Sequence, residues 1–199
     1  RLTKWGFRNL GMWSRGVDTK LFHPRTGKFL KEPRPIFMYL GRVAVEKNIE
    51  AFLKLELSGT QYVVGGGPDL EMLKRKYPAV RFTGFKTGEE LARHLASADV
   101  FVFPSRTDTF GLVLIEAFAC GVPVAAFPVQ GPIDIVTNGV TGFLSEDLQQ
   151  AAIDALGLEP GRCREEALKY TWEACTRQFL GHLQATGPTA TTQTRPAEG

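Results

Sequence analysis

Two acidic residues, Asp108 and Glu116, have the types and spacing that best fit a chemical role in this chain. Glu116 stands in an apolar run typical of a buried helix, and a buried carboxylate is costly unless hydrogen-bond donors satisfy it. Asp108 precedes the start of that helix, which is expected at Phe110 and Gly111, where free backbone N–H groups favour anions. The pair therefore predicts a site for a ligand with hydroxyl groups and phosphates, as in a sugar nucleotide.

A purely structural explanation exists for each of these residues. Asp108, or Thr109 beside it, is of a type that commonly caps a helix. Glu116 could pair with a basic side chain from elsewhere in the core. Both explanations stay open on the sequence alone.

Two basic residues, Arg42 and Lys47, form a second group, five positions apart. They follow an apolar run at 36–40 that is typical of a strand buried on both faces. In open α/β sheets ligands bind beyond the carboxyl ends of the strands, which is where this loop must lie. Arginine offers a fork of donors to phosphate oxygens and lysine a compact charge, which predicts a phosphate site. Two solvated surface cations are the alternative.

The apolar runs predict alternating strands and helices, which is typical of βαβ units on a parallel sheet. The predicted fold class is α/β: a Rossmann-like parallel sheet with helices on both faces. Strands are expected at 36–40, 61–65, 80–83, 100–103 and 123–126. Helices are expected at 48–57, 68–76, 87–96, 111–119, 147–157, 162–169 and 171–184, with a further short unit over 133–144.

Composition narrows the class of protein. The chain has 199 residues, 43% hydrophobic and 23% charged, which suits one ordinary globular domain. No apolar stretch approaches the ~20 residues that span a bilayer. The net charge of +3, without clusters of basic and aromatic residues, argues against nucleic-acid binding. Cys120, Cys163 and Cys175 lack paired spacing, so they argue against a disulfide framework or a zinc site and fit a reducing cytosol.

Several segments, in their order along the chain, resemble the motifs of retaining GT-B glycosyltransferases of group 1, the large family four. They are an interdomain segment at 15–24, a diphosphate loop at 41–48, a glycine turn at 64–68, a nucleobase strand and loop at 80–85, and a Glu-x7-Glu motif at 108–116 with its continuation at 119–124. The resemblance covers residues 13–183 and identifies the chain as the C-terminal donor-binding half of such an enzyme. Asp108 departs from the motif, because it is one methylene shorter than the usual glutamate. Residues 131–134 replace the usual glycine pair and glutamate.

The resemblance implies transfer of a hexose from a UDP- or GDP-linked sugar to an acceptor such as a lipid or polysaccharide precursor, without a cofactor or metal ion. Arg42 and Lys47 would carry the charge of the diphosphate, Glu116 would accept from the ribose hydroxyls, and Asp108 would hold a hydroxyl of the donor sugar. These four are the expected catalytic residues. The expected donor-binding residues are Gly41, Gly84, Phe85, Lys86, Thr109, Phe110, Gly111 and Leu112.

The implied organisation has three parts. Residues 1–24 would lead in from a missing N-terminal domain, 25–184 would form the nucleotide-sugar-binding domain, and 185–199 would be a disordered tail. A cytoplasmic enzyme is expected, whose full-length form could associate peripherally with the inner face of a membrane; this part alone is expected to be inactive. Two alternatives remain: a nucleotide-sugar-binding module without chemistry, and a sugar-nucleotide epimerase or a phosphorylase on the same fold.

Overall fold

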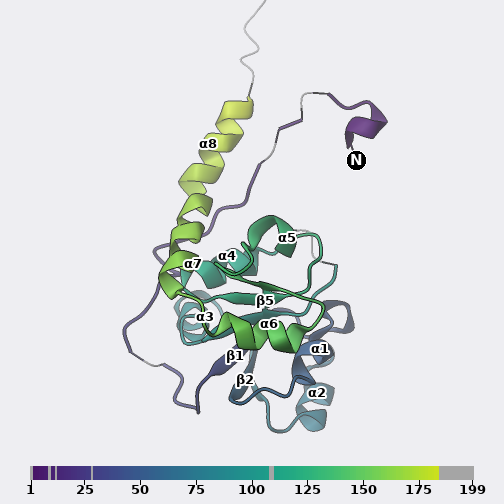
Figure 1. The fold of residues 1–199 in the computed structure, drawn as a ribbon, viewed down its shortest axis with the longest axis vertical. Coiled ribbons are helices and arrows are strands. Elements are labelled where there is room, and N and C mark those ends of the chain that lie inside the picture. The colour runs from purple at the N-terminus through teal and green to yellow at the C-terminus, as the bar shows by residue number, and fades with distance from the viewer. Residues whose placement is uncertain (1, 9, 12, 28, 108–109, 184–199) are drawn as a thin grey trace, which may run out of the picture.

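The computed structural model describes residues 2–8, 10–11, 13–27, 29–107 and 110–183 (Figure 1). Asp108 and Thr109, together with the tail predicted at 185–199, lie outside the described residues.

The centre of the fold is a six-stranded sheet in which every strand pair is parallel. Its strands lie in the order β3-β2-β1-β4-β5-β6. They are β1 (Ile36–Leu40), β2 (Thr60–Val64), β3 (Arg81–Gly84), β4 (Val100–Phe103), β5 (Val124–Ala126) and β6 (Gly142–Leu144). The strand order reverses between β1 and β4, and this is the switch point at which open α/β sheets bind ligands.

Helices cover both faces of the sheet, as predicted. Three of them share one buried core: α3 (Gly88–Leu95), α4 (Leu112–Ala119) and α7 (Pro160–Ala167). Three others share the core on the opposite face: α1 (Ile49–Leu53), α2 (Leu70–Lys76) and α6 (Leu148–Ala155). Ile36 and Met38 of β1 enter the first core, and Phe37 and Tyr39 enter the second. Burial on both faces explains why β1 is a continuous apolar run.

The remaining helical elements are short turns, except for the last helix. They are α5 (Pro132–Ile135), α8 (Trp172–His182) and the 3-10 turns η1 (Leu2–Trp5), η2 (Val45–Lys47) and η3 (Leu168–Tyr170).

The first predicted helix, 48–57, was wrong in its length. The helix runs only over Ile49–Leu53, four residues short of the predicted end at 57, and its C-terminal cap residue is Lys54. At its start, Asn48 takes the left-handed conformation (φ 51°) and separates it from η2. Leu57 lies beyond the helix and still packs against the core, so its apolar character was not a helical signal. The helix predicted at 162–169 begins earlier, at Pro160, since proline suits the first helical turn.

The segment before β1 packs into the domain at residues 17–22. Val17 and Phe22 are buried in the core that α4 and α7 share. The guanidinium of Arg164 on α7 donates to the carbonyls of Thr19 (3.0 Å), Phe22 (2.8 Å) and Ala119 (2.7 Å). The segment at 17–22 is therefore fixed to the C-terminal end of α4.

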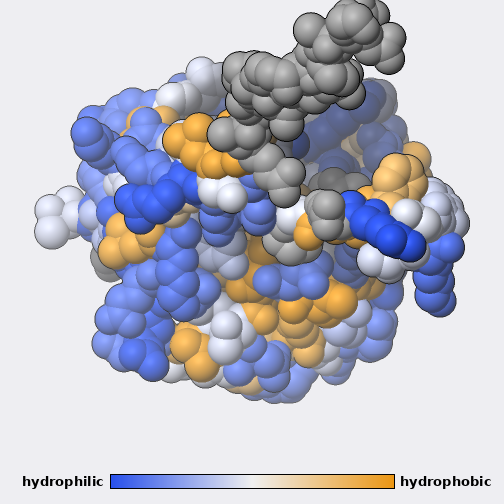
Figure 2. Space-filling model, turned by 90° about the horizontal axis from the view of Figure 1, so that it is seen from above, coloured by the Kyte–Doolittle hydropathy of each residue, from blue (hydrophilic) through white to orange (hydrophobic). Residues whose placement is uncertain are grey.

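Helix α8 extends away from the sheet, and the N-terminal segment comes down beside it (Figure 1). The indole Nε1 of Trp13 donates to Cys175 Sγ (3.1 Å), and the Trp13 and Phe179 rings lie 5.1 Å apart. Both segments leave large apolar side chains exposed, among them Trp5, Trp13, Trp172 and Leu180. In Figure 2 most of the visible face is hydrophilic, with apolar residues in separate patches. None of the helices in the described ranges is long and apolar enough to cross a membrane.

Candidate functional site

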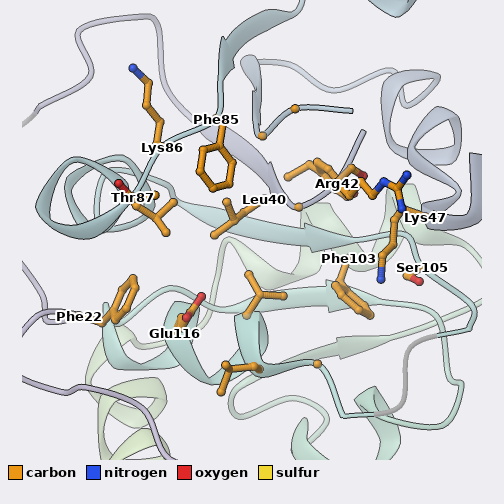
Figure 3. Close-up of a pocket in the computed structure, with 18 of the residues that line it drawn as sticks. Phe22, Leu40, Arg42, Lys47, Phe85, Lys86, Thr87, Phe103, Ser105 and Glu116 are labelled. Atoms are coloured by element: carbon orange, nitrogen blue, oxygen red, sulfur yellow. The ribbon is translucent and has the colours of Figure 1, made fainter. Parts of the chain in front are cut away.

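A cavity of about 840 Å³ opens at the carboxyl ends of β1 to β4, at the switch point of the sheet (Figure 3). Its wall takes residues from the loops after these four strands and from α4. Eight of the twelve site residues predicted from sequence line this cavity. Six of them lie in the loops after the strands or just before α4: Gly41, Arg42, Lys47, Phe85, Lys86 and Gly111. Leu112 and Glu116 of α4 line it as well. The structure therefore brings together two groups that lie more than sixty residues apart in the sequence.

Four predicted residues are not placed in this wall. Gly84 ends β3, and its carbonyl accepts from the N–H of Gly65 (2.9 Å). Phe110 precedes α4 and packs against the core instead. Because α4 begins at Leu112, the N–H of Phe110 is outside the helix start to which it was assigned. Asp108 and Thr109 lie outside the described residues.

The basic residues come from the loop between β1 and α1, as predicted. The Arg42 side chain is 64% exposed, and its Nη1 lies 3.4 Å from Glu46 Oε1. The hydroxyl of Tyr39 donates to the carbonyl of Arg42 (2.7 Å), which fixes the backbone of this loop. Lys47 ends the turn η2 and lines the same cavity. An exposed pair such as Arg42 and Glu46 contributes about 0–1 kcal/mol, so a ligand can replace it readily.

Glycines allow the loops after β1 and β2 to meet backbone to backbone. The N–H of Val43 donates to the carbonyl of Gly66 (2.9 Å). A Cβ on Gly65 (φ 146°) would lie 1.8 Å from the carbonyl oxygen of Gly41, and one on Gly67 would lie 2.2 Å from that of Val43. No side chain fits at either position, which is the physical basis of the glycine turn at 64–68.

Glu116 is half-buried on α4, and its carboxyl group lies in the cavity wall (Figure 3). Burial raises the pKa of this carboxyl to about 7. Within the described ranges, no side chain forms a hydrogen bond or ion pair with it. Pairing with a core cation, the structural explanation for Glu116, therefore finds no support in this part of the chain. In Figure 3 Glu116 lies on the opposite side of the cavity from Arg42 and Lys47.

The start of α4 is open to the cavity. Gly111 precedes the helix with φ 74° and, as a glycine, has no side chain of its own to cap it. A Cβ on Gly111 would lie 2.8 Å from Leu114 Cδ1, so a larger residue would be strained both in backbone and in space. The free N–H groups of the first helical turn carry partial positive charge.

The loop after β3 supplies a largely apolar side of the cavity. Phe85 is 78% exposed, and its ring projects into the cavity in Figure 3. Lys86 instead forms an ion pair with Glu90 (2.5 Å). Sequence analysis missed the other side chains of the wall, which are mostly apolar: Leu21, Phe22, Tyr39, Leu40, Thr87, Leu91, Phe103, Ser105 and Val113. Apolar wall residues carry no signal that separates them from core residues, although Ser105 directly follows the end of a predicted strand.

Residues 34–158 match the family model described as Glycosyl transferases group 1. The chain belongs to this family. Over 197 residues it is 38% identical to a GDP-mannose-dependent alpha-mannosyltransferase of Corynebacterium glutamicum, covering 89% of the chain and 48% of that protein. It is also 37% identical to a sulfoquinovosyl transferase of Arabidopsis thaliana, covering 85% of the chain and 39% of that protein. The group 1 chain thus spans about half, or less, of these relatives.

Solved structures agree with the fold of this group 1 chain. Sucrose-phosphate synthase from Thermosynechococcus elongatus superposes with a TM-score of 0.70 at 30% identity, over 84% of the chain and 50% of that structure. Anabaena HepE in complex with UDP and glucose superposes with a TM-score of 0.62 at 20% identity, over 83% of the chain and 54% of that structure; this likeness shows the fold alone. The predicted Rossmann-like half of a GT-B glycosyltransferase is therefore confirmed as the fold class.

Proposed function

We propose that this group 1 chain is the donor-binding domain of a retaining glycosyltransferase that transfers a hexose from a nucleoside diphosphate sugar. One observation carries the proposal: a cavity at the switch point of the sheet has cations on one side and a half-buried carboxylate on the other. A diphosphate joined to a ribose needs this pair of opposite features.

The carboxylate end fits the ribose. Two ribose hydroxyls would donate to the two oxygens of Glu116, and these bonds would offset the cost of burying its charge. The Phe85 ring and the apolar side chains beside it offer a surface against which a nucleobase can pack. We therefore place the base beside the loop after β3 and the ribose next to Glu116.

The cationic end fits the diphosphate, which is the leaving group of the reaction. Arg42 would exchange Glu46 for phosphate oxygens, and Lys47 and the open start of α4 would add positive charge. Donors fixed where negative charge develops lower the barrier to departure of the diphosphate. The proposal needs no metal ion for this role, because the chain supplies two cationic side chains. Retention of anomeric configuration and the role of Asp108 on the donor sugar remain part of the proposal through the family resemblance.

The identity of the donor is the first thing to test. Relatives at 34–38% identity are named GDP-mannose-dependent alpha-mannosyltransferases, which makes GDP-mannose the first candidate. A thermal-shift panel of GDP-mannose, UDP-glucose, GDP, UDP and ADP would measure binding. A ligand at a hundredfold excess over its Kd stabilises by ~2.7 kcal/mol, which a melting scan resolves. The absence of a shift with every nucleotide would contradict the proposal.

The acceptor and the remainder of the active cleft are proposed to come from a second domain. The chain spans about half of its relatives, and GT-B clefts form between two Rossmann-like domains. We propose that residues 1–199 alone bind the donor without transferring its sugar, because transfer requires an acceptor held in line with the donor. Acceptor-dependent release of nucleoside diphosphate at ordinary enzymatic rates would contradict this. A cytoplasmic location stays a prediction; its support is that Cys120, Cys163 and Cys175 are all free and buried.

A further inference from the structure

The loop after β4 carries a buried hydroxyl group that the site as proposed does not use. Ser105 is 1% exposed and lines the cavity. Among the residues that the structure describes, its Oγ atom has no hydrogen-bond partner. A buried hydroxyl that gives up its bonds to water without replacing them is unfavourable, and such groups in folded proteins are uncommon. A buried hydroxyl of this kind in the wall of a binding cavity indicates that a ligand atom is its hydrogen-bond partner.

The two residues that follow Ser105 are already engaged by the chain. The guanidinium of Arg106 pairs with Glu146 (2.7 Å) and lies over the Phe127 ring, 3.7 Å from its centroid. The hydroxyl of Thr107 donates to the carbonyl of Glu46 (3.4 Å). Of residues 105–107, Ser105 is thus the one whose polar side-chain atom is left for a ligand.

Hydrogen bonds between two loops hold Ser105 close to the phosphate end of the cavity. The side-chain amide of Asn48 donates to the carbonyl of Pro104 (3.0 Å). Asn48 directly follows Lys47, and Pro104 directly precedes Ser105, so one bond joins the neighbours of both residues. The bond from Thr107 to Glu46 ties the same two loops a second time. In Figure 3 Ser105 and Lys47 lie in the same part of the view, away from Glu116.

We propose that Ser105 is a further donor-binding residue, whose hydroxyl donates to an oxygen of the distal phosphate of the nucleoside diphosphate. This inference rests on the proposed function and deepens it. A phosphate oxygen is a charged acceptor, and a hydrogen bond to it is stronger than one between neutral groups. The bound diphosphate thereby gives the Ser105 hydroxyl a hydrogen-bond partner. Lys47 differs, because it attracts the phosphate as a compact charge whose interaction has no fixed direction.

The test compares the affinities of the wild-type chain and of Ser105→Ala by calorimetric titration with UDP, GDP, UMP and GMP. The variant is expected to bind the preferred diphosphate about tenfold more weakly, the effect of losing one hydrogen bond to a charged group. Its affinity for the matching monophosphate is expected to change by less than about twofold. Without ligand, the variant is expected to melt at the same temperature as the wild type or higher, because no internal hydrogen bond is lost.

Ser97→Ala is the matched control. Ser97 is also buried, but its hydroxyl donates to the carbonyl of Arg93 (2.8 Å) and it is not part of the cavity wall. This control is expected to lower the melting temperature and to leave the affinity for nucleotides unchanged.

Each other outcome counts against the inference. Equal affinity of the wild type and Ser105→Ala for the diphosphate would overturn it and leave the proposed function standing. Equal losses for monophosphate and diphosphate would overturn the assignment to the distal phosphate. A lower melting temperature of Ser105→Ala would show that the hydroxyl has a partner within the chain. Failure of the wild type to bind any of the four nucleotides would overturn the proposed function and this inference together.

Discussion

The two ends of the cavity differ in how their charged side chains affect the stability of the ligand-free protein. At one end, Arg42 is an exposed side chain on a loop, and its charge costs the free protein almost nothing. At the other end, Glu116 is half-buried on a helix without a partner in the described residues, and burial raises its pKa to about 7. Removing the charge of Arg42 should therefore affect binding alone. Removing the charge of Glu116 should weaken binding and stabilise the free protein.

The largest effect is expected from the double replacement Arg42→Ala with Lys47→Ala. Both cations proposed to face the diphosphate would be lost, so the affinity for nucleoside diphosphates should fall by roughly a hundredfold or more. The melting temperature without ligand should change little, by the equivalent of about 1 kcal/mol at most. Titration with UDP or GDP and a melting scan measure the two quantities. A large loss of stability would show that the two residues are structural and would remove the difference between the two ends.

Glu116→Gln is expected to give the next largest effect on binding. An amide offers one acceptor oxygen in place of the two of a carboxylate, so affinity for ribonucleotides should fall tens-fold. At pH 8 the same variant should be more stable than the wild type by about 1–3 kcal/mol, because it no longer buries a charge. Denaturant unfolding measures this difference. A 2′-deoxy nucleotide is the control: equal binding of ribo and deoxy forms by the wild type would show that Glu116 is not a ribose ligand.

The raised pKa of Glu116 also predicts a pH dependence with a definite sign. The folded protein holds this proton more firmly than the unfolded chain does. The free energy of unfolding that the protonated carboxyl contributes is therefore lost as pH rises from about 4.5 to about 7. In the proposed function the ribose hydroxyls bind the ionised form, so the affinity for nucleotides should rise as pH increases towards 7 and level off above it. When the pH is lowered from 8 to 6, we expect the nucleotide affinity of the wild type to fall roughly tenfold. The affinity of Glu116→Gln should change with pH only as far as the phosphates themselves titrate. Parallel profiles of affinity against pH for the wild type and the variant would contradict the prediction.

The smallest effect is expected from Asn48, which joins the two loops at the cationic end. Asn48→Gly keeps access to the left-handed conformation at φ 51° but loses the bond to the carbonyl of Pro104. We expect a loss of about 1 kcal/mol in stability and a few-fold loss in nucleotide affinity. Asn48→Asp is the sharper comparison, because its carboxylate would face the same carbonyl without a proton to donate. Unchanged affinity in both variants would show that this bond does not position Lys47.

Local sequence predicted the elements well where burial is continuous. The strands β1 and β4 were predicted at their observed bounds, since every residue of β4 and most of β1 are buried and therefore apolar. The first helix was overextended, because Leu57 is apolar for packing outside any helix. The left-handed Asn48 that ends η2 also donates from its side chain to the carbonyl of Pro104, a contact that spacing along the chain does not reveal.

The site was predicted in part, for a similar reason. Charged residues such as Arg42 and Glu116 stand out in apolar surroundings, and the structure places them in one cavity. Phe22 and Leu91 also line it, but their types equally fit a core. Ser105 was missed because the feature that distinguishes it is a buried hydroxyl without a hydrogen-bond partner in the described residues. That feature can be seen only in the structure. Which loops meet depends on strand order, and residue types alone did not predict that order.

The contact between the loops after β1 and β2 limits how this domain could be re-engineered for another nucleotide. Gly65 and Gly67 face carbonyl oxygens of the neighbouring loop and accept no side chain. That side of the cavity is consequently a fixed wall, and a mutant library that varies it would consist mostly of misfolded proteins. Phe85 extends into open space from a separate loop. Changes in base preference should therefore be sought at Phe85 and its neighbours, where the scaffold tolerates new shapes.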